Sequence, residues 1–448
     1  MNKSKNIDMI HGPMLGKILL FALPLALSSI LQLLFNAADT IVVGKFAGSQ
    51  ALAAVGSNGA LINLLVNAFM GLSVGANVLV ARYRGSGNQQ KISLAVHTAI
   101  LISVTAGIFL AFMGFFVAPK MLLLMSVPED VLPLSSLYLK LYFLGMPFMM
   151  LYNFGAAILR SVGDTRRPLI YLTIAGVINV VLNLIFVIVF DMSVAGVAIA
   201  TVVSQVVSSL LVLRCLTNID DDIRVDLKKL AIDKNCLKEI VKIGLPAGLQ
   251  GCVFSLSNVV IQSSINSFGS IMVAGNSAAI NIEGFIYVTM NSFHQSAVTF
   301  SSQNYGAKQF DRCDKALVLS SVCAMVVGFA MGQLFIMFRE PLLGLYTSDP
   351  AVLEAGYYRM SMLFTFQPIN GLMDVMVGGM RGIGYSLMPT AVSLTGACLL
   401  RLLWIATIFK ANPTIDMLYM VYPVTWIITT SAHIICYLIV RKKIRKSI

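Results

Sequence analysis

Charged side chains are scarce in this chain, and their scarcity excludes a soluble globular protein. Asp, Glu, Lys and Arg make up 12% of the 448 residues, whereas 57% of the residues are hydrophobic and the mean hydropathy is +0.83. A water-soluble domain of this length does not need so many apolar residues to form its core. The composition therefore predicts a protein that crosses a membrane many times.

Other absences exclude whole classes of chemistry. The seven Cys are scattered singly with no C-x-x-C pair, which excludes a disulfide framework and a zinc site. No G-x-x-x-x-G-K-[ST] motif is present to bind ATP. The polar start, residues 1–17, leads into an apolar stretch too long for a cleavable signal peptide. We expect no enzymatic activity, no cofactor and no metal site.

Apolar stretches of about 20 residues, long enough to span a bilayer as helices, occur twelve times. One polar segment, 216–242, separates the first six from the last six, and we expect it to be a solvated linker between a lobe at 1–215 and a lobe at 243–448. The stretches lie near 18–43, 51–78, 94–117, 133–157, 168–190, 194–213, 243–267, 272–298, 316–338, 357–379, 387–409 and 417–440.

The two halves carry an internal repeat. Four residues of the first half recur 221 positions later and two more recur 222 positions later: Pro147, Arg160, Gly163, Pro168, Pro24 and Asn36 match Pro368, Arg381, Gly384, Pro389, Pro246 and Asn258. Because each repeat has an even number of spans, both enter the membrane the same way up. The prediction is an all-α integral membrane protein with a pseudo-two-fold axis along the membrane normal and a cavity between the lobes, as in transporters.

The Lys and Arg residues are distributed unevenly about the membrane. Of the 32, 25 fall on the side of the two termini. The positive-inside bias then places both termini in the cytoplasm of a prokaryotic plasma-membrane protein. This asymmetry accounts for the net charge of +12 without a nucleic-acid partner, and the basic C-terminal end is expected to face anionic lipid. We expect a monomer.

The first apolar stretch carries a polar face. Ser28, Gln32, Asn36 and Asp39 recur at spacings of four, four and three, and Pro24 precedes them and is expected to kink or bend the helix. An ionisable residue in a spanning helix is costly and usually faces a bundle interior or a wet cavity. The alternative is that Asp39, about one turn from the outer end, is simply hydrated at the interface. The polar residues that run inward from it favour the first interpretation.

Two further acids, Glu283 and Asp374, lie inside predicted spans. They are expected to line a substrate cavity that attracts cations, together with Gln32, Asn36 and Asn153, the repeat mate of Asp374. The alternative is that each acid belongs to an internal hydrogen-bonded pair that only locks helix packing.

Two other features concern packing. Arg401 lies near an outer end, where its side chain is expected to reach water. The pairs Gly71 with Gly75 and Gly244 with Gly248 permit helices to approach closely.

A second polar group lies on the fifth and sixth stretches. Asn179 and Asn183 are one turn apart, and Thr201 follows a hairpin so short, 191–194, that its two helices must be antiparallel neighbours. These side chains supply oxygen ligands and hydrogen-bond partners. Around one carboxylate they suit either a protonatable Asp or a small hard cation.

With these motifs the chain resembles the MATE (multidrug and toxic compound extrusion) family, on its DinF-like branch, over essentially its whole length. In that family an Asp on the first span, an Asn and an Asp on the fifth, and a Thr on the sixth form a cation site, and the first-span Pro marks a helix that bends. The resemblance assigns these roles to Asp39, Asn179, Asn183, Thr201 and Pro24.

The chain departs from the family at Asn183, where a second Asp is common. One carboxylate instead of two weakens the case for Na⁺ and favours H⁺ coupling through Asp39. Glu283 and Asp374 leave a second cation site in the C-terminal lobe as an alternative.

The resemblance implies a secondary antiporter that exports amphipathic, often cationic compounds against H⁺ or Na⁺. The alternatives are a flippase for lipid-linked oligosaccharides, which would be expected to line its cavity with cations, and a channel, which needs a continuous polar pore.

Overall fold

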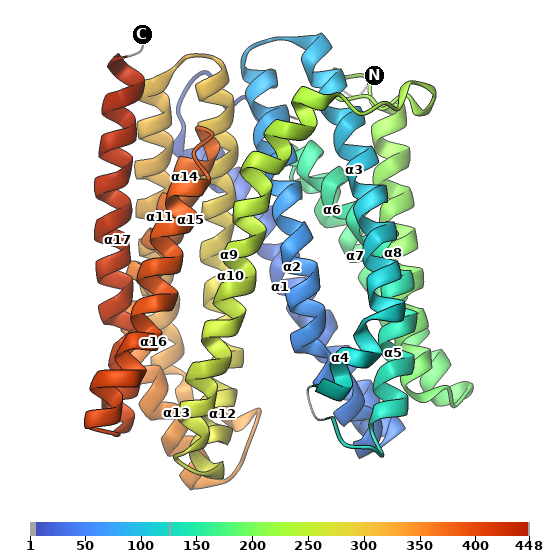
Figure 1. Ribbon diagram of the computed structural model, residues 1–448, viewed down its shortest axis with the longest axis vertical. Coiled ribbons are helices and arrows are strands. Elements are labelled where there is room, and N and C mark those ends of the chain that lie inside the picture. The colour runs from blue at the N-terminus through green and yellow to red at the C-terminus, as the bar shows by residue number, and fades with distance from the viewer. Residues whose placement is uncertain (1–5, 125–126, 447–448) are drawn as a thin grey trace. The chain divides into compact units, whose positions relative to one another are not determined.

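The computed structural model describes residues 6–124 and 127–446, and every regular element within them is a helix (Figure 1). In the hydrocarbon core no water satisfies backbone N–H and C=O groups, so an apolar stretch bonds them within its own helix. The first half contains α1 (Leu15–Val42), α2 (Ser49–Gly85), α3 (Gln89–Phe116), α4 (Ala118–Leu124), α5 (Leu132–Leu144), α6 (Met146–Ser161), α7 (Arg166–Leu184) and α8 (Ser193–Asn218). The second half contains α9 (Lys234–Asn266), α10 (Ser270–Gly306), α11 (Phe310–Met337), α12 (Arg339–Gly344), α13 (Pro350–Leu363), α14 (Gln367–Gly382), α15 (Leu387–Ser393), α16 (Leu400–Trp404) and α17 (Ile415–Lys446).

Short turns of other helical types interrupt or extend these helices. Single π-helical turns follow α1 at Val43–Ala47, α7 at Ile185–Val189, α15 at Leu394–Leu399 and α16 at Ile405–Phe409. Turns of 3-10 helix occupy Leu227–Lys229 and Phe364–Phe366.

Within the described residues, ten helical segments are long and apolar enough to cross a membrane, and the pair α5 and α6, bent by 46°, makes eleven. The remaining predicted stretch, 357–379, falls on the end of α13, the 3-10 turn Phe364–Phe366 and α14. This arrangement confirms the predicted all-α membrane fold with its two lobes.

Repeat-matched prolines explain why the same span is broken in both halves. Pro147 lies in the first turn of α6 and Pro368 in the first turn of α14. Proline has no N–H to donate and cannot continue a preceding helix, but it fits the first turn of a new one. A pattern of apolar residues alone does not reveal this break, which is why the sequence suggested one continuous stretch in each half.

Contacts divide the chain into two compact units that do not follow the predicted boundaries. Unit 1 comprises residues 1–8 and 27–248, and unit 2 comprises residues 9–26 and 249–448. The first part of α1 therefore belongs to unit 2, and the first part of α9 to unit 1. Both helices change unit two residues after a repeat-matched proline, Pro24 or Pro246.

In unit 1 the predicted close approach of glycines is confirmed. A Cβ atom added to Gly71 of α2 would collide with the backbone of Gly244 and Gly248 on α9, and one added to Gly75 would collide with Ile240. Only glycine lets the two helix backbones lie so near each other. The pairs that the sequence offered separately thus face each other across one helix contact.

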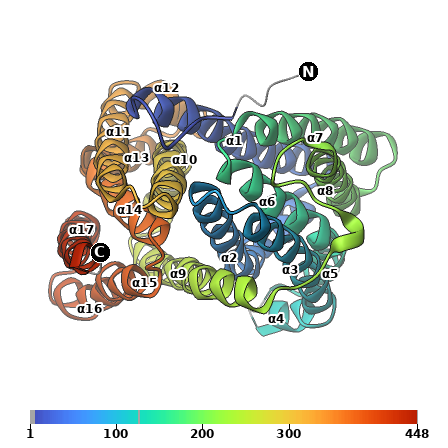
Figure 2. The same cartoon turned by 90° about the horizontal axis from the view of Figure 1, so that it is seen from above.

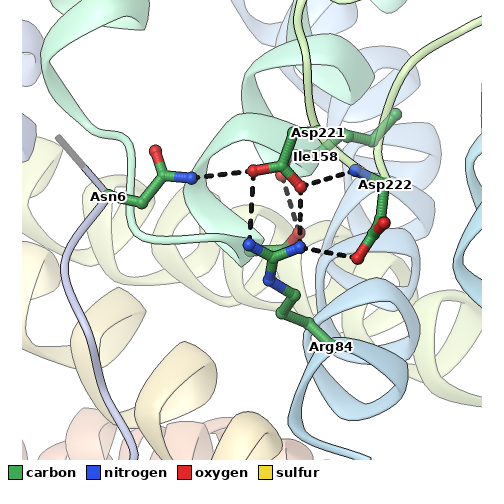
Figure 3. Close-up of polar contacts among 6 residues, drawn as sticks. Asn6, Arg84, Ile158, Asp221 and Asp222 are labelled. Carbon is green, nitrogen blue, oxygen red and sulfur yellow. Dashed lines mark hydrogen bonds and ion pairs between the residues drawn. The ribbon is translucent and has the colours of Figure 1, made fainter. Parts of the chain in front are cut away.

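The linker is bound to unit 1 rather than simply solvated as expected. Arg84, near the end of α2, donates hydrogen bonds from Nη1 to Asp221 Oδ1 at 2.6 Å and to Asp222 Oδ2 at 3.0 Å (Figure 3). Asn6 donates from Nδ2 to the other oxygen of Asp221 at 3.0 Å. A guanidinium group between two acids forms charge-assisted bonds that hold the segment in place.

Two further linker residues are fixed by their backbone. The N–H of Asp226 donates to His97 Nε2, and the N–H of Asp233 donates to Thr98 Oγ1, each at 3.0 Å. Both carboxylates also accept backbone N–H bonds, Asp226 from Lys228 and Asp233 from Cys236 at the start of α9. Because these bonds favour the ionised form, they lower the pKa of each carboxyl below its usual value.

Candidate functional site

The candidate site in unit 1 is a chain of hydrogen bonds that begins at Asp39. Asn183 on α7 donates from Nδ2 to Asp39 Oδ1 on α1 in a short hydrogen bond. The same Nδ2 lies 3.3 Å from Asn179 Oδ1, one turn earlier, and Asn179 Nδ2 lies 3.4 Å from Thr201 Oγ1 on α8. Thr201 in turn donates to the carbonyl of Val197 at 2.9 Å. The structure therefore brings together the four residues predicted for the cation site.

One oxygen in this chain has no partner. Asn183 is fully buried, and its Oδ1 atom accepts no hydrogen bond from the described residues. A buried acceptor left unpaired is costly unless a ligand or an ordered water satisfies it. Beside the carboxylate of Asp39, such an atom can accept a proton-bearing group or ligate a small cation.

The helices that carry Asp39 and Asn183 change type close to these residues. The π-helical turn Val43–Ala47 begins four residues after Asp39, and the turn Ile185–Val189 begins two residues after Asn183. Single π turns inside α-helices are frequent at functional sites. The sequence contained no recognisable signal for them.

The other predicted residues of α1 and α6 stay apart from this chain. Gln32 and Asn36 are exposed on α1 and make no side-chain hydrogen bond within residues 6–124 and 127–446. Asn153 is half-buried and donates to the carbonyl of Met149 on its own helix at 2.8 Å. Pro24 is buried, and α1 runs through it without interruption. A role for Gln32, Asn36 and Asn153 in substrate binding stays a prediction.

In unit 2, Glu283 forms an internal ion pair. Arg359 donates from Nη2 to Glu283 Oε2 at 2.6 Å, and Gln367 donates to Oε1 at 2.7 Å. The second terminal nitrogen of Arg359 donates to Asn276 Oδ1 at 2.9 Å. This geometry matches the alternative stated for Glu283, a pair that locks packing. Sequence reasoning missed Arg359 because it placed the start of this span near 357, whereas α13 begins at Pro350 and carries Arg359 well inside a helix.

Asp374 is also partnered within unit 2. Asn291 donates to Asp374 Oδ2 at 3.0 Å, and His294 Nδ1 lies 3.3 Å from Oδ1 and 2.7 Å from the backbone carbonyl of Asp374. Of the three predicted acids, Asp39 is thus the one that has no basic partner among the described residues.

The prediction for Arg401 was wrong. Its side chain does not reach water at an outer end but is buried, with the guanidinium 4.8 Å from the centroid of the Tyr422 ring. The physical reason is that α16 packs against α17 (Figure 2). On α17, Tyr422 offers an aromatic ring on which the guanidinium can stack.

Comparison with known proteins decides the family. The family model described as MatE matches residues 24–185 and again residues 246–407, which together make up more than half of the chain. The chain belongs to the MatE family. The two matches have equal length and begin at Pro24 and Pro246, which supports the internal repeat found in the sequence. As a MatE protein with many apolar helices, the chain is a multi-pass membrane transport protein.

Relatives of this MatE protein carry names from drug export and from other transport. It is 26% identical over 382 residues to a probable multidrug resistance protein, YoeA, of Bacillus subtilis, covering 84% of this chain and 82% of that protein. It is 26% identical over 371 residues to an FAD transporter of Shewanella oneidensis, covering 80% of each.

Solved structures share the fold. An outward-facing multidrug resistance MATE family transporter of the MOP superfamily gives a TM-score of 0.90 at 21% identity, covering 100% of this chain and 99% of that chain. A MATE crystallised in a bent conformation gives 0.89 at 21% identity, covering 99% and 98%.

Proposed function

We propose that this MatE protein is a secondary antiporter that exports amphipathic, often cationic compounds in exchange for H⁺, with Na⁺ as the alternative coupling ion. The observation that carries the proposal is the lone carboxylate of Asp39, bonded to Asn183 and lacking a basic partner among the described residues. Relatives named as multidrug resistance proteins support the cargo class.

The geometry suits one site that alternates between two occupants. When Asp39 is ionised, the amide of Asn183 stabilises the charge and the carboxylate can attract a cation. When Asp39 is protonated, the attraction is lost and a cationic cargo leaves. Exchange requires each ligand to bind the two conformations of the transporter with different affinity. A membrane potential supplies about 2.3 kcal/mol per charge per 100 mV, enough for roughly fiftyfold accumulation.

The chain has three places where the helices of this site can change shape. Pro24 removes one backbone hydrogen bond from α1, and the π turns after α1 and α7 can tighten to α-helix. We propose that α1 bends when Asp39 changes its occupant. The protein is proposed to work as a monomer in the plasma membrane with both termini in the cytoplasm.

One carboxylate favours H⁺ over Na⁺. Hard cations are bound through several oxygen ligands with fixed negative charge, and here Asn183 occupies the place of a second acid. A proton needs only one carboxylate.

The test is dye efflux from proteoliposomes under an imposed pH gradient or an imposed Na⁺ gradient. Asp39→Asn removes the titratable group but keeps the side-chain size, and we expect it to abolish gradient-driven efflux. Glu354→Gln, at an exposed acid of α13, is the matched control and is expected to transport normally. Wild-type efflux in Asp39→Asn would remove Asp39 from the mechanism.

A further inference from the structure

Unit 2 buries two guanidinium groups around one tyrosine ring. Arg359 on α13 and Arg401 on α16 lie 5.6 Å and 4.8 Å from the centroid of Tyr422 on α17. Both arginines are almost fully buried, at 2% and 5% exposure. A charged side chain inside a membrane-spanning helix is costly and usually marks a functional site.

Of the two cations, Arg359 alone forms an ion pair within the described residues. Glu283 accepts one hydrogen bond from Arg359 and one from Gln367. Among the described residues, no Asp or Glu pairs with Arg401, whose Nε atom lies 3.4 Å from Thr425 Oγ1. Its two terminal nitrogens make no hydrogen bond to the described residues. Arg401 therefore presents two free donors and forms no ion pair within the described residues.

Helix ends do not compensate this charge. Arg160 is half-buried and Arg381 is buried, but both lie in the last turns of α6 and α14, where the carbonyl end of a helix is negative. Arg401 lies in the short helix α16, inside the continuous apolar segment Leu387–Phe409 and eight residues before the end of that segment. Stacking on Tyr422 orients the guanidinium plane but supplies no counter-charge.

We propose that Arg401 binds an anionic group, a carboxylate or a phosphate, within the group of helices α13, α16 and α17. A guanidinium presents parallel N–H donors that match the two oxygens of such a group, and the tyrosine face holds it flat. The anionic group belongs either to the exported compound or to a lipid headgroup. In the first case the inference rests on the proposed export function and narrows its cargo to compounds that carry an acidic group on an apolar body.

The chain contains its own reporter for this site. Its two tryptophans are Trp404, three residues after Arg401, and Trp426, whose ring lies 5.7 Å from that of Tyr422. Binding at Arg401 is therefore expected to change the intrinsic tryptophan fluorescence of the full-length protein. No tryptophan elsewhere in the chain obscures the signal.

The experiment titrates the purified protein, in nanodiscs of phosphatidylcholine, with benzoate and with inorganic phosphate. We expect a saturable fluorescence change. The binding affinity should fall at least tenfold in Arg401→Gln. It should fall less in Arg401→Lys, which keeps the charge but loses the planar pair of N–H donors. Arg339→Gln is the matched control, because Arg339 also stacks on a tyrosine, 4.9 Å from the ring of Tyr357, on α12. Tetraphenylphosphonium is a cation with an apolar body, and we expect its binding affinity to be the same in Arg401→Gln as in the wild-type protein.

A second set of titrations distinguishes the two possible sources of the anionic group, the exported compound and a lipid headgroup. If a lipid headgroup is the ligand, nanodiscs containing phosphatidylglycerol abolish the benzoate response; if the cargo is the ligand, the response persists. The proposal is overturned if the wild-type protein shows no saturable change in either lipid, or if both Arg401→Gln and Arg401→Lys keep wild-type affinity. If Arg401→Gln does not fold, the affinity of Arg401→Lys tests the proposal, because wild-type affinity in that variant overturns it. Because this binding is measured without a gradient, its failure is distinct from a failure of gradient-driven efflux.

Discussion

Asn183 is the residue on which the choice of coupling ion depends. Its amide nitrogen donates to Asp39, and its buried oxygen has no partner among the described residues. An amide at this position stabilises an ionised neighbour without adding charge. Replacing it by an acid would place two carboxylates within hydrogen-bond distance, and like charges so close cannot both stay ionised without a cation between them.

Asn183→Asp is therefore expected to shift coupling toward Na⁺. A second charge at this distance contributes on the order of several kcal/mol of attraction for a bound cation at an effective dielectric of 20, so Na⁺-driven dye efflux should rise at least tenfold. The measurement compares efflux under Na⁺ and pH gradients. Asn218→Asp, at an exposed position near the end of α8, is the control. Unchanged ion preference in Asn183→Asp would contradict this account of the site.

Among the elements, the contact between α2 and the first part of α9 depends most on the absence of side chains. A Cβ atom at Gly71 meets the backbone of Gly244 and Gly248, which cannot rotate away as a side chain would. The helices must separate to admit it, and every contact along them loosens.

Gly71→Ala is expected to destabilise the protein by about 1–3 kcal/mol, the usual cost of overpacking a close contact. Gly59→Ala on the same helix is the matched control, since a Cβ atom there has no neighbour within 4 Å. Thermal unfolding in detergent micelles measures both. Equal melting temperatures of the two variants would show that the close approach is not required.

The start of α9 is expected to respond to acid. The backbone N–H of Cys236 donates to the carboxylate of Asp233 at 2.8 Å, which lowers the pKa of that carboxyl below its usual value. The stabilisation of the ionised form is therefore present above the unfolded-state pKa, about 3.9, and is lost as the pH falls through the lower folded-state pKa.

We expect hydrogen exchange at the amides of residues 234–238 to be slow at neutral pH and to accelerate, beyond its intrinsic pH dependence, below about pH 4. Asp233→Asn keeps a capping oxygen but cannot titrate, so its protection should not change in this range. If both proteins respond to acid alike, the carboxyl of Asp233 does not hold the helix start.

For the whole molecule, the distribution of Lys and Arg predicts which side each loop faces. The linker and both termini lie on the basic side of the sequence, and the loop between α12 and α13 lies on the other.

Lys229→Cys, at a linker side chain that is 79% exposed, is expected to react with a membrane-impermeant maleimide only in inside-out vesicles. Ser348→Cys, in the exposed loop before α13, is expected to react only in right-side-out vesicles. Labelling of the parent chain, whose cysteines are all free thiols, gives the background. Reaction of both variants in the same vesicles would contradict the predicted topology.

The repeat links the sequence to the whole fold. Matched prolines at 147 and 368 could be recognised in the sequence, but their effect, two broken spans, became visible only in α5–α6 and α13–α14. Likewise, the sequence supplied both glycine pairs, whereas their pairing between α2 and α9 depends on a part of α9 that belongs to unit 1.

The sequence by itself determined the all-α membrane fold, the duplication and the grouping of Asn179, Asn183 and Thr201, to which the family resemblance adds Asp39. These follow from apolar length, from spacing along one helix and from a short hairpin, which are properties of neighbouring residues. Tertiary structure alone decided which partners the buried charged groups have: Glu283 pairs with Arg359, Asp374 contacts His294, and Arg401 pairs with no acid among the described residues. The physical reason is that electrostatic compensation depends on distances between side chains far apart in the chain, and these exist only after the helices have packed.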